Sequence, residues 1–166
     1  MKKKKDYEVI DNFLPEDKFK EIHNFCIHEM PWYYKCGTAL RNGPDLFHFR
    51  HSFYEDNQIR STSFDKIINP ILDHPKFTYY GLLRAKGNLY TQTKEVFEHD
   101  NHIDFPIPHK GFLLYINTNN GFTILEDGTK IESVENRALF FNSGKKHRST
   151  TCSDKHIRVN ININYV

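Results

Sequence analysis

The C-terminal segment of the chain has the most regular alternation of polar and apolar residues in the sequence. From Arg158 to Asn164 the residues run Arg, Val, Asn, Ile, Asn, Ile, Asn. Successive side chains of a strand point to opposite faces, so this pattern predicts a half-buried β-strand. For Asn162 and Asn164, a position facing bulk water would explain the polar side chain as well as a functional role would. The apolar face would consist of Val159, Ile161 and Ile163, and the polar face of Arg158, Asn160, Asn162 and Asn164.

Two earlier segments have the spacing of amphipathic helices. Pro15 suits a first helical turn, because the N–H that proline lacks would have no partner there. Apolar residues follow it at helical intervals, and a second such series begins at Ser63 and contains Pro70, which should kink or divide the helix. We expect both helices to cover the apolar face of the sheet. The apolar positions are Phe19, Ile22, Phe25 and Cys26 in the first series and Phe64, Ile67, Ile68, Ile71 and Leu72 in the second.

Short apolar runs separated by turn residues occupy residues 111–141. Gly111 to Ile116 and Ala138 to Phe141 are predicted as strands, with turns at Asn117 to Gly121 and at Glu126 to Gly128. Such a succession is typical of an antiparallel β-sandwich or jelly roll. Residues 31–60 are rich in aromatic residues but have no clear period. We expect a loop-rich segment there, whose rings either extend the core or contact a substrate.

Composition narrows the classes of protein to consider. The 166 residues, 38% of them hydrophobic, suffice for a single domain with its own core. The net charge of +2 is too small to indicate nucleic-acid binding, and the run Lys2 to Lys5 is expected to be a disordered, solvated tail. No apolar run has the length of a membrane span, and no signal-peptide core follows the lysines. Three cysteines at unrelated spacings favour reduced thiols, with Cys26 in a helix core, so we expect a cytoplasmic protein.

One group of polar residues has the spacing of a metal site. His102 and Asp104 are separated by one residue, so they would share a face if residues 101–105 were extended. With His147 they provide two imidazoles and one carboxylate, a set that suits Fe(II) and leaves coordination positions open. The absence of a nearby cysteine argues against a thiolate zinc site. Arg158 follows downstream and offers a guanidinium fork that matches a carboxylate.

Other histidines compete for the metal-binding role. His99 would need an acidic partner at position 101, which is asparagine, and His109 follows two prolines, as expected of a loop at a cavity rim. His156 lacks the spacing to a carboxylate and a second histidine. We therefore expect these three histidines to be solvated or to lie at the rim.

These motifs resemble those of the Fe(II)/2-oxoglutarate-dependent dioxygenases, specifically the prolyl-4-hydroxylase-like branch. The resemblance covers residues 79–166 and the opening segment Val9 to Leu14 with the helix after it. It implies a mainly β fold with flanking helices: a double-stranded β-helix, or cupin-like jelly roll, with N-terminal helices packed on one sheet. It also implies that His102, Asp104 and His147 hold the iron and that Arg158 pairs with the C5 carboxylate of 2-oxoglutarate. Further co-substrate contacts are implied for Tyr115, Tyr90 and Asn160, although the two tyrosines would also suit an ordinary aromatic core.

The activity implied by the resemblance is hydroxylation of an unactivated C–H bond, coupled to oxidative decarboxylation of 2-oxoglutarate to succinate and CO2. Fe(II), 2-oxoglutarate and O2 would take part, with ascorbate as a candidate reductant, and no catalytic side chain is assigned beyond the metal centre. Peptidyl proline as the substrate rests on the resemblance alone, and another peptide or a small molecule stays open. The chain departs from the family pattern in the short segment between Asp104 and His147 and at Gly121-Phe122, where paired glycines are common. Four unranked candidates could recognise an anionic substrate: Arg41, Arg50, Arg60 and Arg84.

The predicted organisation is one oxygenase domain over residues 1–166. It comprises a basic tail at 1–6, a helical scaffold and substrate lid at 9–78, and the β-helix core at 79–166. The alternative is a non-catalytic, cupin-type binding module with its histidines at the rim. Nucleic-acid demethylation is disfavoured, because that branch has a further arginine after the co-substrate arginine, where this chain has only asparagines and a tyrosine.

Overall fold

The structure is a computed structural model that describes residues 5–37 and 47–166. Lys2 to Lys4 of the predicted tail and the candidate Arg41 lie outside these residues. The helical elements are α1 (Glu16–Asn24), the π-helix η1 (Phe25–Glu29), α2 (Phe64–Ile67) and α3 (Asn69–Leu72). The strands are β1 (Tyr7–Ile10), β2 (Tyr33–Cys36), β3 (Phe47–Glu55), β4 (Gln58–Ile59), β5 (Leu82–Thr91), β6 (Lys110–Tyr115), β7 (Phe122–Ile124), β8 (Lys130–Glu132), β9 (Ala138–Phe141), β10 (Arg148–Ser149) and β11 (Ile157–Tyr165).

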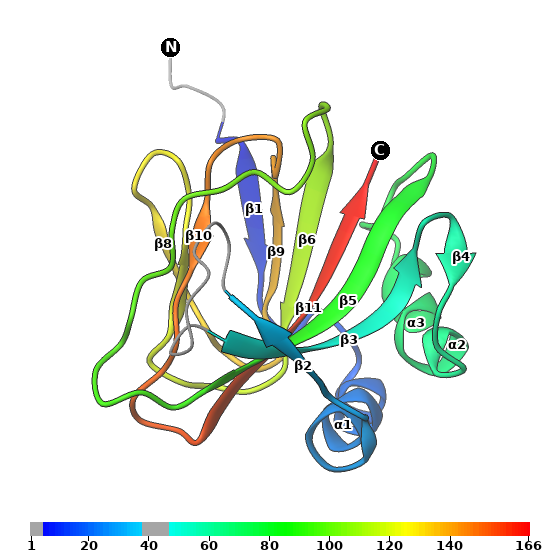
Figure 1. Cartoon of the computed structure of the whole chain (residues 1–166). Helices are drawn as coiled ribbons and strands as arrows, with labels where there is room; N and C mark the ends of the chain where they lie inside the picture. Colours follow the sequence, from blue (N-terminus) through cyan, green and yellow to red (C-terminus); the bar gives the residue numbers. More distant parts are fainter. Residues whose placement is uncertain (1–4, 38–46) are drawn as a thin grey trace.

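The strands form two antiparallel sheets (Figure 1). The larger sheet has the order β1-β9-β6-β11-β5-β3-β2, with β4 paired to β3, and the smaller has the order β10-β7-β8. The predicted strand Arg158 to Asn164 is therefore the middle of β11, hydrogen-bonded to β5 on one side and β6 on the other. The expected strands at 111–116 and 138–141 are confirmed as β6 and β9.

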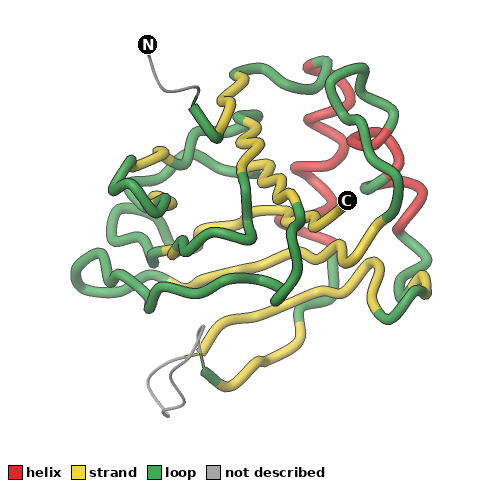
Figure 2. The backbone as a smooth tube through the Cα atoms, turned by 90° about the horizontal axis from the view of Figure 1, so that it is seen from above, coloured by secondary structure: helices red, strands yellow, loops and turns green. Residues whose placement is uncertain are grey.

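The helices lie together on one side of the larger sheet (Figures 1 and 2). Their predicted apolar positions are buried in one core with Val159, Ile161 and Ile163 of β11, which confirms the expected packing. Pro70 divides the second helical segment into α2 and α3, as its lack of an N–H donor requires. Within the described residues, every helix is too short or too polar to span a lipid bilayer.

The other face of β11 is buried as well, which corrects the expectation of a half-buried strand. Asn162 is 7% exposed and Asn164 is fully buried, so neither faces bulk water. Strand β5 continues this polar face, because its alternate residues lie opposite those of β11 in register. The opposed pairs are Arg158 with Tyr90, Asn160 with Asn88, Asn162 with Lys86 and Asn164 with Arg84.

The segment 31–60 is more regular than predicted. It contributes β2, β3 and β4, and β3 pairs with β5, so the larger sheet continues beyond residues 79–166. Strand β1 also joins this sheet by pairing with β9. Residues 9–78 are therefore not simply a helical scaffold: two of the sheet's outer strands, β2 and β3, come from this region. In β2 the adjacent Tyr33 and Tyr34 place an aromatic ring on each face, and in β3 His51 and Tyr54 break the alternation that Phe47, Phe49 and Phe53 would otherwise set.

Candidate functional site

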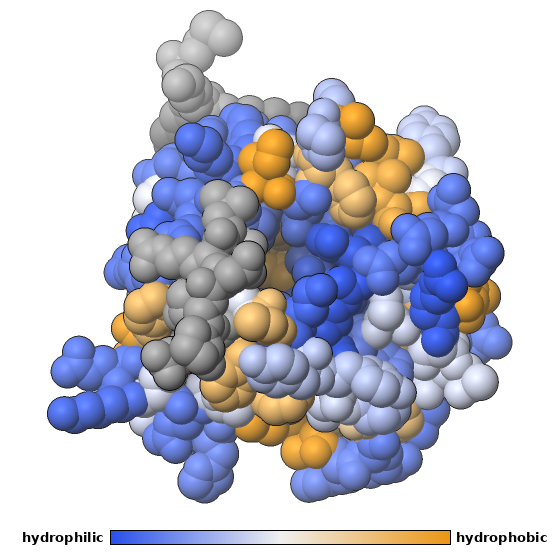
Figure 3. Space-filling model, in the orientation of Figure 1, coloured by the Kyte–Doolittle hydropathy of each residue, from blue (hydrophilic) through white to orange (hydrophobic). Residues whose placement is uncertain are grey.

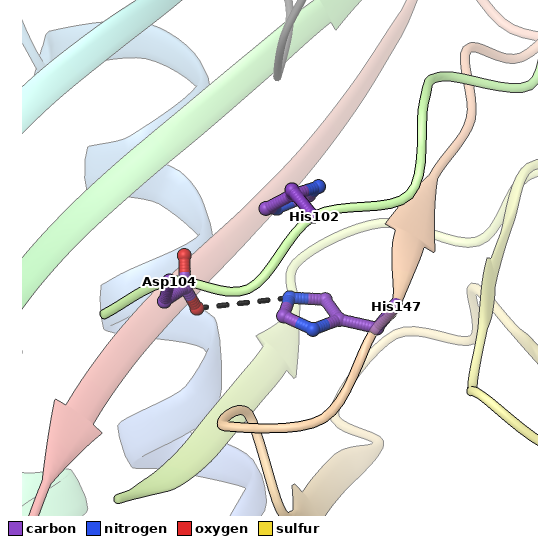
Figure 4. A group of neighbouring side chains, drawn as sticks. All are labelled: His102, Asp104 and His147. Atoms are coloured by element: carbon purple, nitrogen blue, oxygen red, sulfur yellow. Dashed lines mark ion pairs between the residues drawn. The ribbon is translucent and has the colours of Figure 1, made fainter. Parts of the chain in front are cut away.

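A single backbone bridge brings the three predicted metal ligands together. His102 and His147 exchange two backbone hydrogen bonds, with N–O distances of 2.9 and 3.0 Å, in an isolated antiparallel bridge. Residues 101–105 form no regular strand beyond this bridge, so the predicted extended segment is only partly correct. The ligand atoms of His102, Asp104 and His147 nevertheless all lie within 4.8 Å of one another. Figure 4 shows the three side chains converging, with Asp104 Oδ2 3.7 Å from His147 Nε2.

Both imidazoles are oriented by backbone carbonyls. His102 Nδ1 lies 3.2 Å from the Asp100 carbonyl oxygen, and His147 Nδ1 lies 3.0 Å from that of Lys145. A carbonyl only accepts, so each Nδ1 must carry the proton and each Nε2 presents its lone pair. Burial lowers the pKa of His147, which keeps this imidazole neutral at neutral pH. Neutral imidazoles with the second nitrogen bonded in this way are the form that binds metal ions.

The Asp104 carboxylate is held at both oxygens. Arg84 Nη2 donates to Oδ1 at 2.8 Å, and Asn164 Nδ2 donates to Oδ2 at 2.8 Å. Burial alone would raise the pKa of Asp104, but the nearby cations Lys86 and Arg84 hold it well below its usual range. Asp104 is therefore an ionised carboxylate in a fixed orientation, and the donor set fits a divalent metal such as Fe(II).

Arg158 is fully buried behind the metal ligands, beneath the smaller sheet. It donates to the hydroxyls of Ser133 and Ser149, both at 2.8 Å, and at 3.3 Å to Thr123 Oγ1 and to the Thr150 carbonyl. No carboxylate of the described residues pairs with it, although a buried charge normally requires an opposite one. Of its five N–H donors, these four bonds leave one, on Nη2, for an incoming acceptor.

The surroundings of Arg158 fit a co-substrate pocket. The rings of Tyr90 and Tyr115 have their centroids 5.6 and 5.7 Å from its Cζ, and the Tyr115 hydroxyl donates to Thr123 Oγ1 at 2.8 Å. Asn160 accepts a 2.9 Å hydrogen bond from Asn88 Nδ2. The cavity beside the metal ligands brings together residues of the two sheets and the metal site: Lys86, Asn88, Tyr90, His102, Asp104, Thr123, His147, Ser149 and Asn160.

A glycine is required where the chain passes the Arg158 side chain. A Cβ atom at Gly121 would lie 2.6 Å from Arg158 Cδ and 2.6 Å from the Thr151 carbonyl oxygen. Both distances are shorter than van der Waals contact, and the carbonyl belongs to the backbone. Gly121 therefore leaves the space through which the guanidinium reaches its hydroxyl partners.

Two of the competing histidines are not solvated, which leaves the predicted position at a cavity rim. His99 is 5% exposed and His109 is 6% exposed, so both are buried rather than solvated, whereas His156 is exposed as expected. Desolvation lowers the pKa of His99 to about 3. Neither histidine joins a metal-binding group: among the described residues, only His102, Asp104 and His147 form one.

Comparison with known proteins assigns the fold. No family model and no curated protein matches the chain by sequence. A viral collagen prolyl hydroxylase from Paramecium Bursaria Chlorella virus-1, in complex with 2-oxoglutarate, is 17% identical, with 98% of this chain and 97% of that one covered and a TM-score of 0.58. A 2OG-Fe(II) oxygenase family oxidoreductase from Burkholderia pseudomallei is 10% identical, with coverages of 96% and 84% and a TM-score of 0.70. The fold is that of the 2-oxoglutarate- and Fe(II)-dependent oxygenases. HygX from Streptomyces hygroscopicus, with nickel, 2-oxoglutarate and hygromycin B bound, shares this oxygenase fold at 10% identity, coverages of 96% and 82% and a TM-score of 0.60.

The sequence prediction named Arg84, Asn164 and Gly121 but missed their roles at the site, which are to hold Asp104 and to make room for Arg158. Residues 84–90 read Arg, Ala, Lys, Gly, Asn, Leu, Tyr, an alternation as regular as that of β11 and a signal for a second polar strand face. Asn164 was on the predicted polar face, but the pattern does not distinguish a cavity from solvent. Nothing in a single sequence marks Gly121 as a close approach, because the contact joins residues distant along the chain.

Proposed function

We propose that the chain is an Fe(II)- and 2-oxoglutarate-dependent dioxygenase that hydroxylates an unactivated C–H bond. The observation that carries this proposal is the unpaired charge of Arg158 in a buried site next to the His102, Asp104 and His147 cluster. A dicarboxylate that reaches from the metal to Arg158 would supply the missing counter-charge. The oxygenase fold supports the same assignment.

The roles of the residues follow from their contacts. His102, Asp104 and His147 would hold Fe(II), and Arg158, with Thr123 and Ser149, would bind the C5 carboxylate of 2-oxoglutarate. Tyr90 and Asn160 would line the co-substrate, and Tyr115 would orient the Thr123 hydroxyl. When bound, Fe(II) and 2-oxoglutarate supply the oxidation, in which O2 gives one oxygen atom to succinate and one to the product. Ascorbate would serve as the reductant that keeps the iron in its Fe(II) state.

Peptidyl proline is the substrate that the fold comparisons suggest first, because a collagen prolyl hydroxylase shares the fold. HygX shows that the same fold also binds a small molecule, hygromycin B. A panel of proline-rich peptides, assayed for a product one oxygen heavier by mass spectrometry, tests the first class directly.

The activity is tested by loading the protein with Fe(II) and 2-oxoglutarate without oxygen. We expect a weak visible charge-transfer band, and slow formation of succinate once air is admitted. His102→Ala and Asp104→Ala should abolish both signals, whereas Arg60→Gln, which removes an exposed cation paired with Asp56, should leave them unchanged. Failure of metal-free wild type, reloaded with Fe(II), to give the band would refute the oxygenase proposal and favour a binding module of cupin type.

A further inference from the structure

Basic side chains surround a second cavity next to the metal ligands, on the side of β3 and β2. This cavity has a volume of about 300 Å³ and adjoins the cavity already described. The two cavities share six lining residues: Lys86, Asn88, Tyr90, His102, Asp104 and Ser149. Its cationic lining comes from three adjacent strands: Lys35 of β2, Arg50 of β3, and Arg84 and Lys86 of β5. Figure 3 shows strongly hydrophilic side chains gathered beside a hollow near the centre of this face.

Few negative charges compensate these cations. Among the described lining residues, Asp104 is the only one with a carboxylate, and Glu55 forms an ion pair with Arg50 from just outside. The charges of Fe(II), Asp104, Arg158 and the two carboxylates of 2-oxoglutarate add up to zero. Within the described part of the chain, Glu55 is then the one remaining negative charge beside Lys35, Arg50, Arg84 and Lys86. The described residues therefore leave a formal excess of three positive charges, or two if Lys86 is neutral.

The cations also retain unused donors. Lys35 and Lys86 make no hydrogen bond or ion pair to any described residue. The buried Nε of Arg84 has no acceptor within the described part of the chain. Arg50 bonds to Ser52 and Glu55 through Nη2, so its other guanidinium nitrogens have no described partner. Lys35 is exposed, but the donors of Arg50, Arg84 and Lys86 are partly desolvated at the wall of the cavity, and such donors favour an anionic acceptor.

We infer that the primary substrate is a small molecule with a carboxylate or phosphate group, which binds between Lys35 and Arg50. This inference rests on the proposed function, because it places the C–H bond to be oxidised at the metal end of the same cavity. The overall reaction would combine substrate, O2 and 2-oxoglutarate to give the hydroxylated substrate, succinate and CO2. A cavity of about 300 Å³ is at the small end of ligand pockets and suits a metabolite better than an extended chain.

Binding of the anion can be measured without turnover. The protein is loaded with Mn(II) and saturating 2-oxoglutarate, which occupies the Arg158 site, and inorganic sulfate is titrated in by calorimetry at low ionic strength. We expect saturable binding that Arg50→Gln weakens about tenfold or more, as for loss of a charged hydrogen bond. Lys35→Gln, at an exposed residue where folding is not at risk, should weaken it several-fold, and Arg60→Gln should not change it. The inference is overturned if wild type shows no saturable sulfate binding. It is also overturned if Arg50→Gln and Lys35→Gln bind sulfate as tightly as wild type.

The substrate class is tested with a cell extract divided by ultrafiltration and then by anion exchange. Active enzyme should form a product one oxygen heavier in the small, anion-exchange-retained fraction, and Lys35→Gln should need more of that fraction for the same yield. A product found only among retained large molecules would identify an acidic peptide or nucleic acid, and one in the unretained fraction would identify a neutral substrate; either overturns the inference. If wild type shows neither the charge-transfer band nor succinate, the proposed function fails instead, whereas the sulfate titration still reports on the basic cavity.

Discussion

Replacing Arg158 by glutamine removes the charge that we assign to 2-oxoglutarate. The guanidinium is fully buried, all its described partners are neutral, and one of its N–H donors is left for the ligand. Loss of a buried charged contact of this kind costs about 2–5 kcal/mol. At about 1.4 kcal/mol per factor of ten, the dissociation constant for 2-oxoglutarate should rise by about 30-fold to several thousand-fold.

The assay is an anaerobic titration of the Fe(II)-loaded variant with 2-oxoglutarate, followed through the charge-transfer band. Thermal unfolding of the metal-loaded protein gives a second measure, because ligand at 100 times its dissociation constant stabilises a protein by about 2.7 kcal/mol. The variant should lose this stabilisation but keep its affinity for Fe(II), since Arg158 contacts none of the three metal ligands. Arg60→Gln is the control, because it replaces an exposed arginine in the same way and should leave 2-oxoglutarate binding unchanged.

A folded Arg158→Gln variant that binds 2-oxoglutarate as tightly as wild type would refute the assignment of Arg158 to the co-substrate. A uniform loss of both Fe(II) and 2-oxoglutarate binding would point instead to a damaged fold. Without ligand, the variant should be about as stable as wild type, because it no longer buries a charge that lacks a counter-charge.

Three further predictions concern the residues around the site. Asn164→Ala should weaken metal binding about 10- to 100-fold, because it releases Asp104 Oδ2. Asn162→Ala, on the same strand face, should leave metal affinity unchanged, and competition with a chelator measures both affinities. Gly121→Ala should displace the Arg158 side chain and weaken 2-oxoglutarate binding without changing affinity for Fe(II); unchanged 2-oxoglutarate binding would contradict the close approach. Burial lowers the pKa of His99 from 6.5 to about 3 in the folded protein, so as the pH falls the unfolded chain binds a proton at His99 first. The contribution of His99 to the free energy of unfolding is therefore complete above pH 6.5 and is lost as the pH falls toward 3. Between pH 6.5 and 5, the free energy of unfolding of the metal-free protein should therefore fall by about 1.5 kcal/mol less in His99→Gln than in wild type. Denaturant unfolding at each pH measures this difference.

The parts of the fold that were predictable depend on contacts close in sequence or on a strict period. The division of the second helix follows from Pro70, and β11 follows from its alternation. The ligand pair His102 and Asp104 follows from a spacing of two residues, although the chain there holds its geometry through one bridge to His147 rather than through a strand.

The parts that were missed depend on which surfaces meet after folding. Alternation shows that Asn164 shares a face with Arg158, but the burial of that face depends on residues far away in sequence. Thr123 and Ser149 of the smaller sheet contact Arg158, whereas Asp104 and Ser143 contact Asn164. The burial of His99 likewise depends on folding, because its ring lies against Tyr90 and its backbone N–H donates to the Ser149 carbonyl. Strand β3 escaped prediction although Phe47, Phe49 and Phe53 share one face, because His51 interrupts that face and the aromatic Tyr54 lies on the other.

The position of β11 in the sheet constrains how this protein can change over time. Arg158 and Asn164 are six residues apart, about 20 Å along the strand at about 3.3 Å per residue. Deleting one residue between them would turn one of these two side chains to the helix-covered face, so co-substrate binding or the orientation of Asp104 would be lost in a single event. Strands β2 and β3, at the other side of β5, carry Lys35 and Arg50 but no metal ligand. Mutations in β2 and β3 could therefore alter substrate preference while the oxidising centre stays intact. We expect the sequence of this sheet edge to vary more readily than that of β11 in the middle of the sheet.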